Sequence, residues 1–204
     1  MENANTITYT AFAGATRIAS GALADVAGQV RQQFGPEEAA SVAIFDDLES
    51  RPIDLDWRGT LGDVLSRLII IESERSLTAD ADAVARGRGR PKLGVVAREV
   101  TLLPRHWDWL SGQPGGASVA LRKLVEAARH EQAGADNIRR ARDSAYRFIS
   151  AMAGNQPGFE EATRALFAGD ATGFADHSDA WPQDLREHAR RLAAPGFGEA
   201  TQAA

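Results

Sequence analysis

The chain has no cysteine among its 204 residues, and this absence removes several kinds of chemistry at once. Disulfide frameworks, thiolate zinc sites and cysteine nucleophiles are all excluded. The four histidines do not have the spacing of a zinc site. The sequence also lacks a glycine-rich phosphate loop after a strand, and it lacks a nucleophile elbow. We therefore expect neither a cofactor nor a metal, and we expect that the protein is not an enzyme.

Long apolar segments are also missing. The longest uninterrupted runs, such as Leu68–Ile71, are far shorter than the roughly 20 residues that a membrane-spanning helix needs. The first ten residues, MENANTITYT, are polar and do not show the basic region and apolar run of a secretory signal. These features predict a soluble cytoplasmic protein with no membrane partner.

Positive charge, in contrast, is concentrated in one short stretch. The net charge of the chain is −5, and residues 1–85 carry six basic and fourteen acidic residues. Residues 86–105 carry six basic residues and a single acidic one. Within them the run RGRGRPK, residues 86–92, alternates arginine with glycine and ends in proline and lysine. A thin cationic arm of this kind fits the narrow, electronegative minor groove of A·T-rich DNA. A solvated flexible linker is the alternative interpretation.

Hydrophobic periodicity divides the rest of the chain into parts. Residues 1–74 predict a small acidic α+β domain of ββαββα order. Its expected strands are Tyr9–Phe12, Thr16–Ala19, Ser41–Phe45 and Arg51–Trp57, and its expected helices are Leu23–Phe34 and a segment capped by Thr60. Residues 75–94 form a linker that contains the basic arm. Residues 135–194 predict a helical region, with helices over 138–152, 157–167 and 182–192, and residues 195–204 predict a disordered tail.

Residues 95–131 have the order strand, short helix, turn, longer helix. Val95–Leu103 is rich in β-branched residues, and Pro104 suits the first turn of a helix. Ser118 is a good N-cap for the second helix. That helix has an apolar stripe at the spacing i, i+3, i+4, i+7, formed by Leu121, Leu124, Val125 and Ala128.

This order, in VTLLPRHWDWLSGQPGGASVALRKLVEAAR, resembles the ribbon-helix-helix DNA-binding fold of Arc, MetJ and CopG-type repressors. The resemblance implies a dimer whose paired strands enter the major groove, with a phosphate held at the start of the second helix near Ser118. The preceding run is similar to an AT-hook, whose Arg-Gly-Arg-Pro core corresponds to Arg88–Pro91. The full chain also resembles a bacterial family catalogued as a domain of unknown function, and that resemblance implies no activity.

Two phases of the predicted strand remain open. The ribbon-helix-helix pattern directs Arg98, Val100 and Leu102 into the groove and buries Glu99, Thr101 and Leu103. The opposite phase exchanges the two faces completely, because side chains alternate along a strand. The first phase buries a carboxylate, which is costly without a partner. The second phase turns Glu99 toward the phosphates, so neither phase is typical of a strong base reader.

We therefore predict a dimeric DNA-binding protein, either a transcription regulator or a nucleoid-associated protein. The residues expected to contact DNA are Arg86, Arg88, Arg90, Lys92, Arg98, Thr101, Arg105 and Ser118. The alternative is a protein-interaction or scaffold module in which residues 95–131 serve only to dimerise. A third interpretation is a metal-dependent enzyme with Mg²⁺ held by Asp46, Asp47, Asp54 and Asp56. A solvated sheet face and a turn explain the same four residues.

Overall fold

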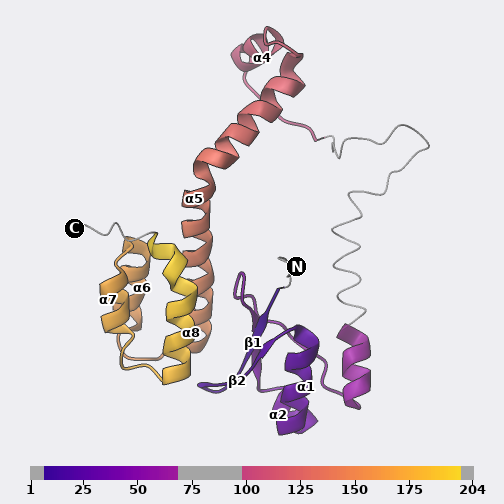
Figure 1. Ribbon diagram of the computed structural model, residues 1–204, viewed down its shortest axis with the longest axis vertical. Helices are drawn as coiled ribbons and strands as arrows, with labels where there is room; N and C mark the ends of the chain where they lie inside the picture. The colour runs from indigo at the N-terminus through magenta and orange to yellow at the C-terminus, as the bar shows by residue number, and fades with distance from the viewer. Residues whose placement is uncertain (1–6, 69–97, 199–204) are drawn as a thin grey trace, which may run out of the picture. The chain divides into compact units, whose positions relative to one another are not determined.

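The computed structural model describes residues 7–68 and 98–198, which fall into two compact units. Unit 1 combines residues 1–70 with residues 134–204, and unit 2 is residues 71–133. The long helix α5 (Gly116–Met152) begins in unit 2 and ends in unit 1 (Figure 1). Strands and helices are both present, and helices predominate, so the predicted α+β class is confirmed.

A three-stranded antiparallel sheet in unit 1 has the order β2–β1–β3. Its strands are β1 (Tyr9–Ala13), β2 (Thr16–Gly21) and β3 (Ala43–Asp46). The first two form the predicted hairpin, and Gly14 in its turn has a φ of +58°, a conformation that glycine adopts without strain. In the central strand, Tyr9 lies opposite Gly21 on one side and Asp46 on the other.

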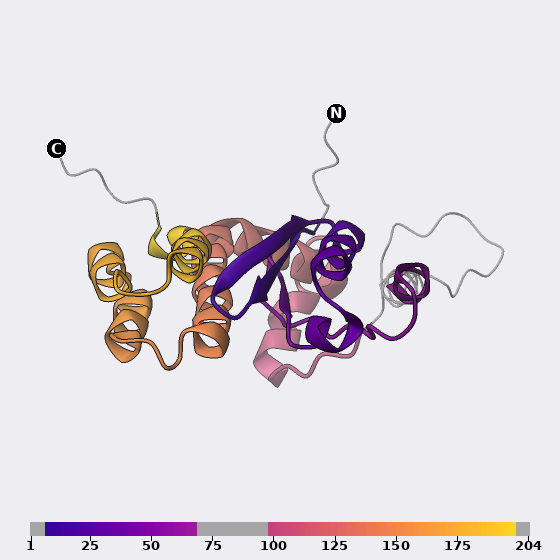
Figure 2. The ribbon, with the colours of Figure 1, turned by 90° about the horizontal axis from the view of Figure 1, so that it is seen from below.

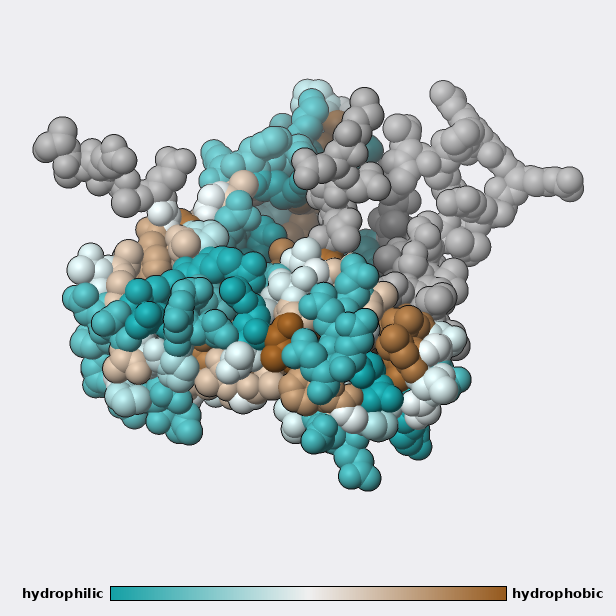
Figure 3. All heavy atoms as spheres, turned by 60° about the horizontal axis from the view of Figure 1, so that its bottom comes forward, coloured by the Kyte–Doolittle hydropathy of each residue, from teal (hydrophilic) through white to brown (hydrophobic). Residues whose placement is uncertain are grey.

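Both faces of the sheet are covered, because alternate side chains of β1 enter different cores. Tyr9 and Ala11 pack with residues of α1 (Leu23–Gln33), which is the predicted first helix. Phe12 enters the other core, where its ring centroid lies 5.3 Å from that of Phe148 on α5. Figure 2 shows the sheet between α1 on one side and α8 on the other. The face of unit 1 in Figure 3 is mostly hydrophilic, with hydrophobic residues in small separate groups.

The C-terminal helices pack around the second half of α5. They are α6 (Phe159–Ala168), α7 (Ala171–His177), α8 (Gln183–Ala193) and the short 3-10 helix η1 (Ala194–Phe197). The predicted helices over 138–152, 157–167 and 182–192 correspond to α5, α6 and α8, whereas α7 was not predicted. The predicted disordered tail begins at residue 195, but residues 194–197 form η1, and residues 199–204 lie outside the described residues.

The predicted ββαββα order is not confirmed, because the segment Arg51–Trp57 does not form a strand. It makes one isolated bridge, between Pro52 and Phe45, and Ile53 donates a hydrogen bond of 2.8 Å to the Ile44 carbonyl. Asp46 donates a second hydrogen bond, 3.1 Å long, to the Arg51 carbonyl, and among the described residues the pairing does not extend beyond this single bridge. The order in this region is β1, β2, α1, α2 (Pro36–Ala39), β3 and a helix over residues 61–68.

Unit 2 differs from the ribbon-helix-helix pattern in two respects. Residues 98–103 are not in a strand, and residues 95–97 of the predicted strand lie outside the described residues. The first helix is present as α4 (Pro104–Ser111), but the second continues unbroken to Met152 instead of ending near residue 131. Residues 131–135 contain no proline, and the helix tolerates Gly134 at a cost of about 1 kcal/mol.

Candidate functional site

The structure describes only half of the residues that were expected to contact DNA. Arg86, Arg88, Arg90 and Lys92 lie outside the described residues, and so does the AT-hook-like run that they form. Arg98, Thr101, Arg105 and Ser118 are described, and all four are exposed. Ser118 is not an N-cap, because α5 already begins at Gly116. It lies in the first turn of the helix, where its carbonyl accepts a 3.2 Å hydrogen bond from Arg122.

Most arginines of unit 1 are held by oxygen atoms of the same chain. Three basic residues of α5 that could have formed a DNA-binding face are examples. Arg139 pairs with Asp136 at 3.0 Å, Arg142 donates to the Gly196 carbonyl at 2.7 Å, and Arg147 donates to the Glu49 carbonyl. Arg142 and Arg147 thereby tie α5 to other segments of unit 1, and Arg139 pairs within its own helix.

Two cations of unit 2 have no such partner. Among the described residues, neither a carboxylate nor a carbonyl pairs with the side chains of Arg105 and Lys123, and both residues are exposed. In unit 1 the same is true of Arg17 alone among the described arginines. Available positive charge in the described part of the chain is therefore more common in the unit that also contains the arm.

Three of the four aspartates suggested as a Mg²⁺ site, Asp46, Asp47 and Asp56, are used by the fold itself, and Asp54 is exposed. Asp46 accepts hydrogen bonds from the backbone N–H groups of Leu48, Glu49 and Arg51, so it shapes the turn after β3. Asp56 pairs with Arg58 at 2.8 Å, and this hydrogen bond holds the pKa of the carboxyl well below its ordinary value. No group of three or more potential metal-ligating His, Asp or Glu side chains occurs among the described residues.

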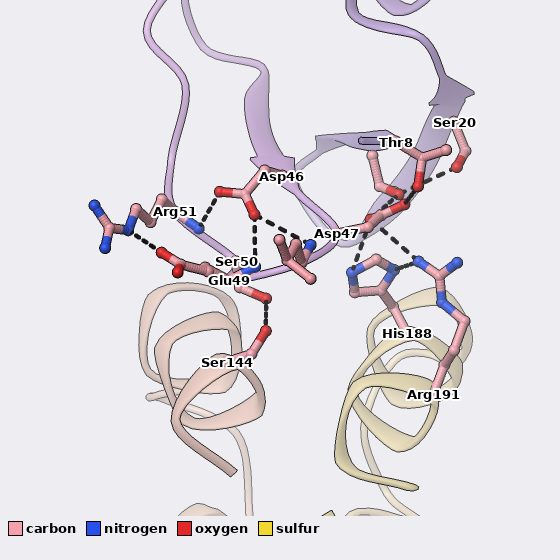
Figure 4. Close-up of polar contacts among 12 residues, drawn as sticks. Thr8, Ser20, Asp46, Asp47, Glu49, Ser50, Arg51, Ser144, His188 and Arg191 are labelled. Atoms are coloured by element: carbon pink, nitrogen blue, oxygen red, sulfur yellow. Dashed lines mark hydrogen bonds and ion pairs between the residues drawn. The ribbon is translucent and has the colours of Figure 1, made fainter. Parts of the chain in front are cut away.

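Asp47 is the centre of a polar network that sequence patterns did not reveal (Figure 4). Thr10 of β1 and Thr8, which precedes that strand, each donate a 2.7 Å hydrogen bond to its carboxylate. Arg191, on α8, reaches the same carboxylate at 3.2 Å. The network thereby connects β1 with α8 through Asp47, which is 144 residues from Arg191 in the sequence.

His188 lies beneath this network and is 1 % exposed. Its Nδ1 accepts a 3.0 Å hydrogen bond from Arg191, because a guanidinium can only donate. The ring proton is consequently on Nε2, which lies 3.9 Å from Asp47 and has no hydrogen-bond partner among the described residues. The rings of Phe12 and Phe148 lie against the imidazole, with centroids 5.2 and 4.5 Å away.

The surroundings of His188 keep its imidazole neutral. Burial, followed by the positive charge of Arg191, lowers its pKa to about 4, and the charge of Asp47 offsets this only in part. A group with so low a pKa is a poor general base at neutral pH. The network joins the sheet to α8 through the carboxylate of Asp47.

A second polar contact joins the turn after β3 to α5. The hydroxyl oxygens of Ser50 and Ser144 lie 2.8 Å apart, and both residues are buried. Ser50 has a φ of +53°, which is uncommon for a residue with a side chain. Both polar contacts therefore anchor the turn after β3. Ser144 joins this turn to α5, and Arg191 joins it to α8.

One sequence signal could have identified His188. It lies at the spacing i, i+3, i+4, i+7 with Leu185, Ala189 and Leu192, all of which are buried in α8. A histidine at a core position of this stripe is expected to be buried, and His188 is. No sequence pattern indicates that Asp47 lies near His188, because the two residues meet only in the folded structure.

The fold and these contacts define an α+β protein in which Asp46, Asp47 and His188 support the packing of unit 1. The chain belongs to the family described as an uncharacterized protein conserved in bacteria (DUF2239), whose model matches residues 8–193. This confirms the resemblance of the full chain to a bacterial family of unknown function. Comparisons with curated proteins and with solved structures gave no match. No helix among the described residues is both long and apolar enough to cross a membrane.

Proposed function

We propose that the protein is a dimeric DNA-binding protein, of the regulatory or nucleoid-associated type, and that unit 2 provides the contacts to DNA. The observation that carries this proposal is the distribution of available positive charge. Residues 86–105 hold six basic residues against one acidic residue, and within the described part of this stretch Arg105 is exposed without an ion-pair partner. Most arginines of unit 1, in contrast, are held by oxygens of the same chain, as with Arg139 and Arg142.

In this proposal the arm at residues 86–92 supplies most of the affinity. Its cations release counterions from the DNA on binding, and its alternating glycines let the guanidinium groups enter an A·T-rich minor groove. Arg98, Thr101, Arg105 and Ser118 are exposed and would contact the sugar-phosphate backbone beside the arm. Such contacts position the protein on the duplex without reading its sequence.

The proposed dimer rests on the small amount of apolar surface that unit 2 buries. Among the described residues 98–133, only Leu110 and Ala120 are buried. Leu103 has extended backbone angles, and Val100 and Leu103 are 53 % and 48 % exposed. A second copy that packs about a twofold axis against Val100, Leu103 and the exposed Leu124 of α5 would cover these side chains.

The DNA-binding proposal is tested by measuring duplex affinity against salt. We expect that replacing Arg88 and Arg90 with Ala weakens binding to an A·T-rich duplex. The slope of log K against log salt should also fall by about two units, because two phosphate contacts are lost. A matched control replaces Arg139 and Arg140 of unit 1 with Ala and should leave both quantities unchanged. Equal affinity and slope in all three proteins would reject a role for the arm in binding.

The dimer is tested by light scattering without DNA. Leu124 on α5 is 49 % exposed, and a Leu124→Glu substitution should produce a monomer, because a carboxylate cannot be desolvated in an apolar interface without a partner. Leu48 in unit 1 is 67 % exposed and provides the control, since Leu48→Glu should leave the dimer intact. A monomeric parent protein at micromolar concentration would contradict the proposal.

A protein-interaction or scaffold module is the second candidate function. The observation in its favour is the same apolar surface, which includes Trp107, Leu124 and Val125 at 38, 49 and 57 % exposure. This candidate shares the dimer with the first but needs no DNA. Duplex binding that is absent at low salt, in a protein that still dimerises, would favour it.

A further inference from the structure

The four tryptophans of the chain fall into two different kinds. Trp57 and Trp181 are 6 % and 2 % exposed, and the indole N–H of Trp181 donates a 2.8 Å hydrogen bond to the Pro157 carbonyl. Trp107 and Trp109, both on α4, are 38 % and 55 % exposed. Among the described residues no aromatic ring packs against either of these two. A tryptophan exposed by half leaves a large apolar ring in water, and such residues are enriched at binding surfaces.

The two exposed rings lie on different sides of α4. Residues two apart in a helix are separated by about 200°, so Trp107 and Trp109 point in nearly opposite directions. Trp107 shares its side with Leu103 and Leu110, at the spacing of an apolar seam, and belongs to the proposed dimer surface. Trp109 lies outside that seam.

Trp109 shares its side of the helix with Arg105, four residues before it. The guanidinium of Arg105 has no ion-pair or hydrogen-bond partner among the described residues, as shown above. The face therefore offers an uncovered indole ring beside an available cation. An aromatic ring beside an arginine or lysine is the combination that binds single strands, in which bases stack on the ring while the cation meets a phosphate.

We propose that the Arg105–Trp109 face of α4 binds unpaired nucleotides of single-stranded DNA. Stacking between neighbouring base pairs covers the flat faces of the bases in a duplex, so a ring of this size can stack only on a base that is unpaired and exposed. The inference rests on the proposed DNA-binding function in its choice of a nucleic acid partner. It adds a preference for single-stranded substrate and assigns that preference to two residues outside the arm.

The test measures the affinity of the full chain for a fluorescently labelled oligothymidylate and for an A·T-rich duplex, by anisotropy. Trp109→Ala should weaken oligothymidylate binding about tenfold, and Trp109→Phe should restore most of it, because phenylalanine keeps a stacking face. Duplex affinity should be unchanged in both variants. Tyr146→Ala is the control, since Tyr146 in unit 1 is 42 % exposed and should have no effect on either substrate.

Equal binding of oligothymidylate by the parent and Trp109→Ala would overturn the inference. It would also be overturned if Trp109→Ala dissociated the dimer in light scattering, since the ring would then contact a protein. The two proposals fail in different ways. Loss of duplex binding in the Arg88 and Arg90 variant, with oligothymidylate binding that does not depend on Trp109, would leave the arm's role in place and reject only the single-strand site.

Discussion

Unit 1 and unit 2 bury their side chains to very different extents. In unit 1 the rings of Phe12, Phe45 and Phe148 meet between the sheet and α5, with centroids 5.3 to 5.5 Å apart. In the described part of unit 2 only Leu110 and Ala120 are buried. Burial offsets the loss of conformational entropy on folding, so unit 1 has the means to be stable alone. Unit 2 instead presents a surface whose apolar groups need a partner.

The comparison predicts the largest effect in the core of unit 1. Phe148 is fully buried, and we expect Phe148→Ala to lower the free energy of unfolding by about 3–5 kcal/mol, because it removes a ring and leaves a cavity. Leu124 in unit 2 is half exposed, and Leu124→Ala at concentrations that favour the monomer should change the value by less than about 0.5 kcal/mol. Urea unfolding measures the free energy of unfolding of both variants. Losses of similar size would contradict the difference in burial between the two units.

A somewhat smaller effect is expected from acid. The folded pKa of His188 is about 4, below the unfolded value, so the unfolded chain binds an extra proton between these two pH values. The contribution of neutral His188 to the free energy of unfolding is fully present above about pH 6.5. It is lost progressively as pH falls toward 4, and the total loss is about 3 kcal/mol. Asp47, Arg191 and Arg17 are the charged groups that act on the ring.

The variant His188→Gln separates this contribution from the titration of the carboxyl groups. Its stability between pH 6.5 and 4 should fall less steeply than that of the parent. The exposed His177 serves as the control, and His177→Gln should keep the steep decline. Parallel stability curves for the parent and His188→Gln would contradict the account of the network.

The smallest of these effects concerns the Ser50–Ser144 contact. Ser144→Ala leaves a buried hydroxyl of Ser50 without its partner, and we expect a loss of about 1–3 kcal/mol. Removing both hydroxyls should cost less than the sum of the two single changes, since the unpaired group is then absent. A double-mutant cycle by urea unfolding measures this coupling, and strict additivity would show that the contact contributes nothing.

Local patterns predicted the parts of the fold that depend on neighbouring residues. The hairpin of Tyr9–Gly21, helix α1 and the helix after Thr60 are marked by alternation, periodicity or a cap, and each is present. The segment after Arg51 alternates like a strand, and its Leu55 and Trp57 are indeed buried. It is still not a strand, because burial and ladder pairing are separate requirements, and among the described residues the segment makes only the bridge between Pro52 and Phe45.

The polar network could not be predicted in the same way. Asp47 and His188 belong to elements that meet only when the sheet packs against α8, and no short motif joins them. The aspartates drew attention as possible metal ligands because carboxylates close in sequence suggest a shared site. In the structure Asp46 turns to the backbone of its own turn and Asp47 to α8, so the two carboxylates serve different contacts.

The central claim is that unit 2 binds DNA while unit 1 maintains the fold. Hydrogen exchange of the full chain, with and without an A·T-rich duplex, tests it most directly because it reports on every part of the chain at once. We expect DNA to slow exchange in residues 98–133 and in the arm, with exchange in β1, β3 and α8 unchanged. Slower exchange confined to unit 1, for example around Asp47 and Arg191, would contradict the account.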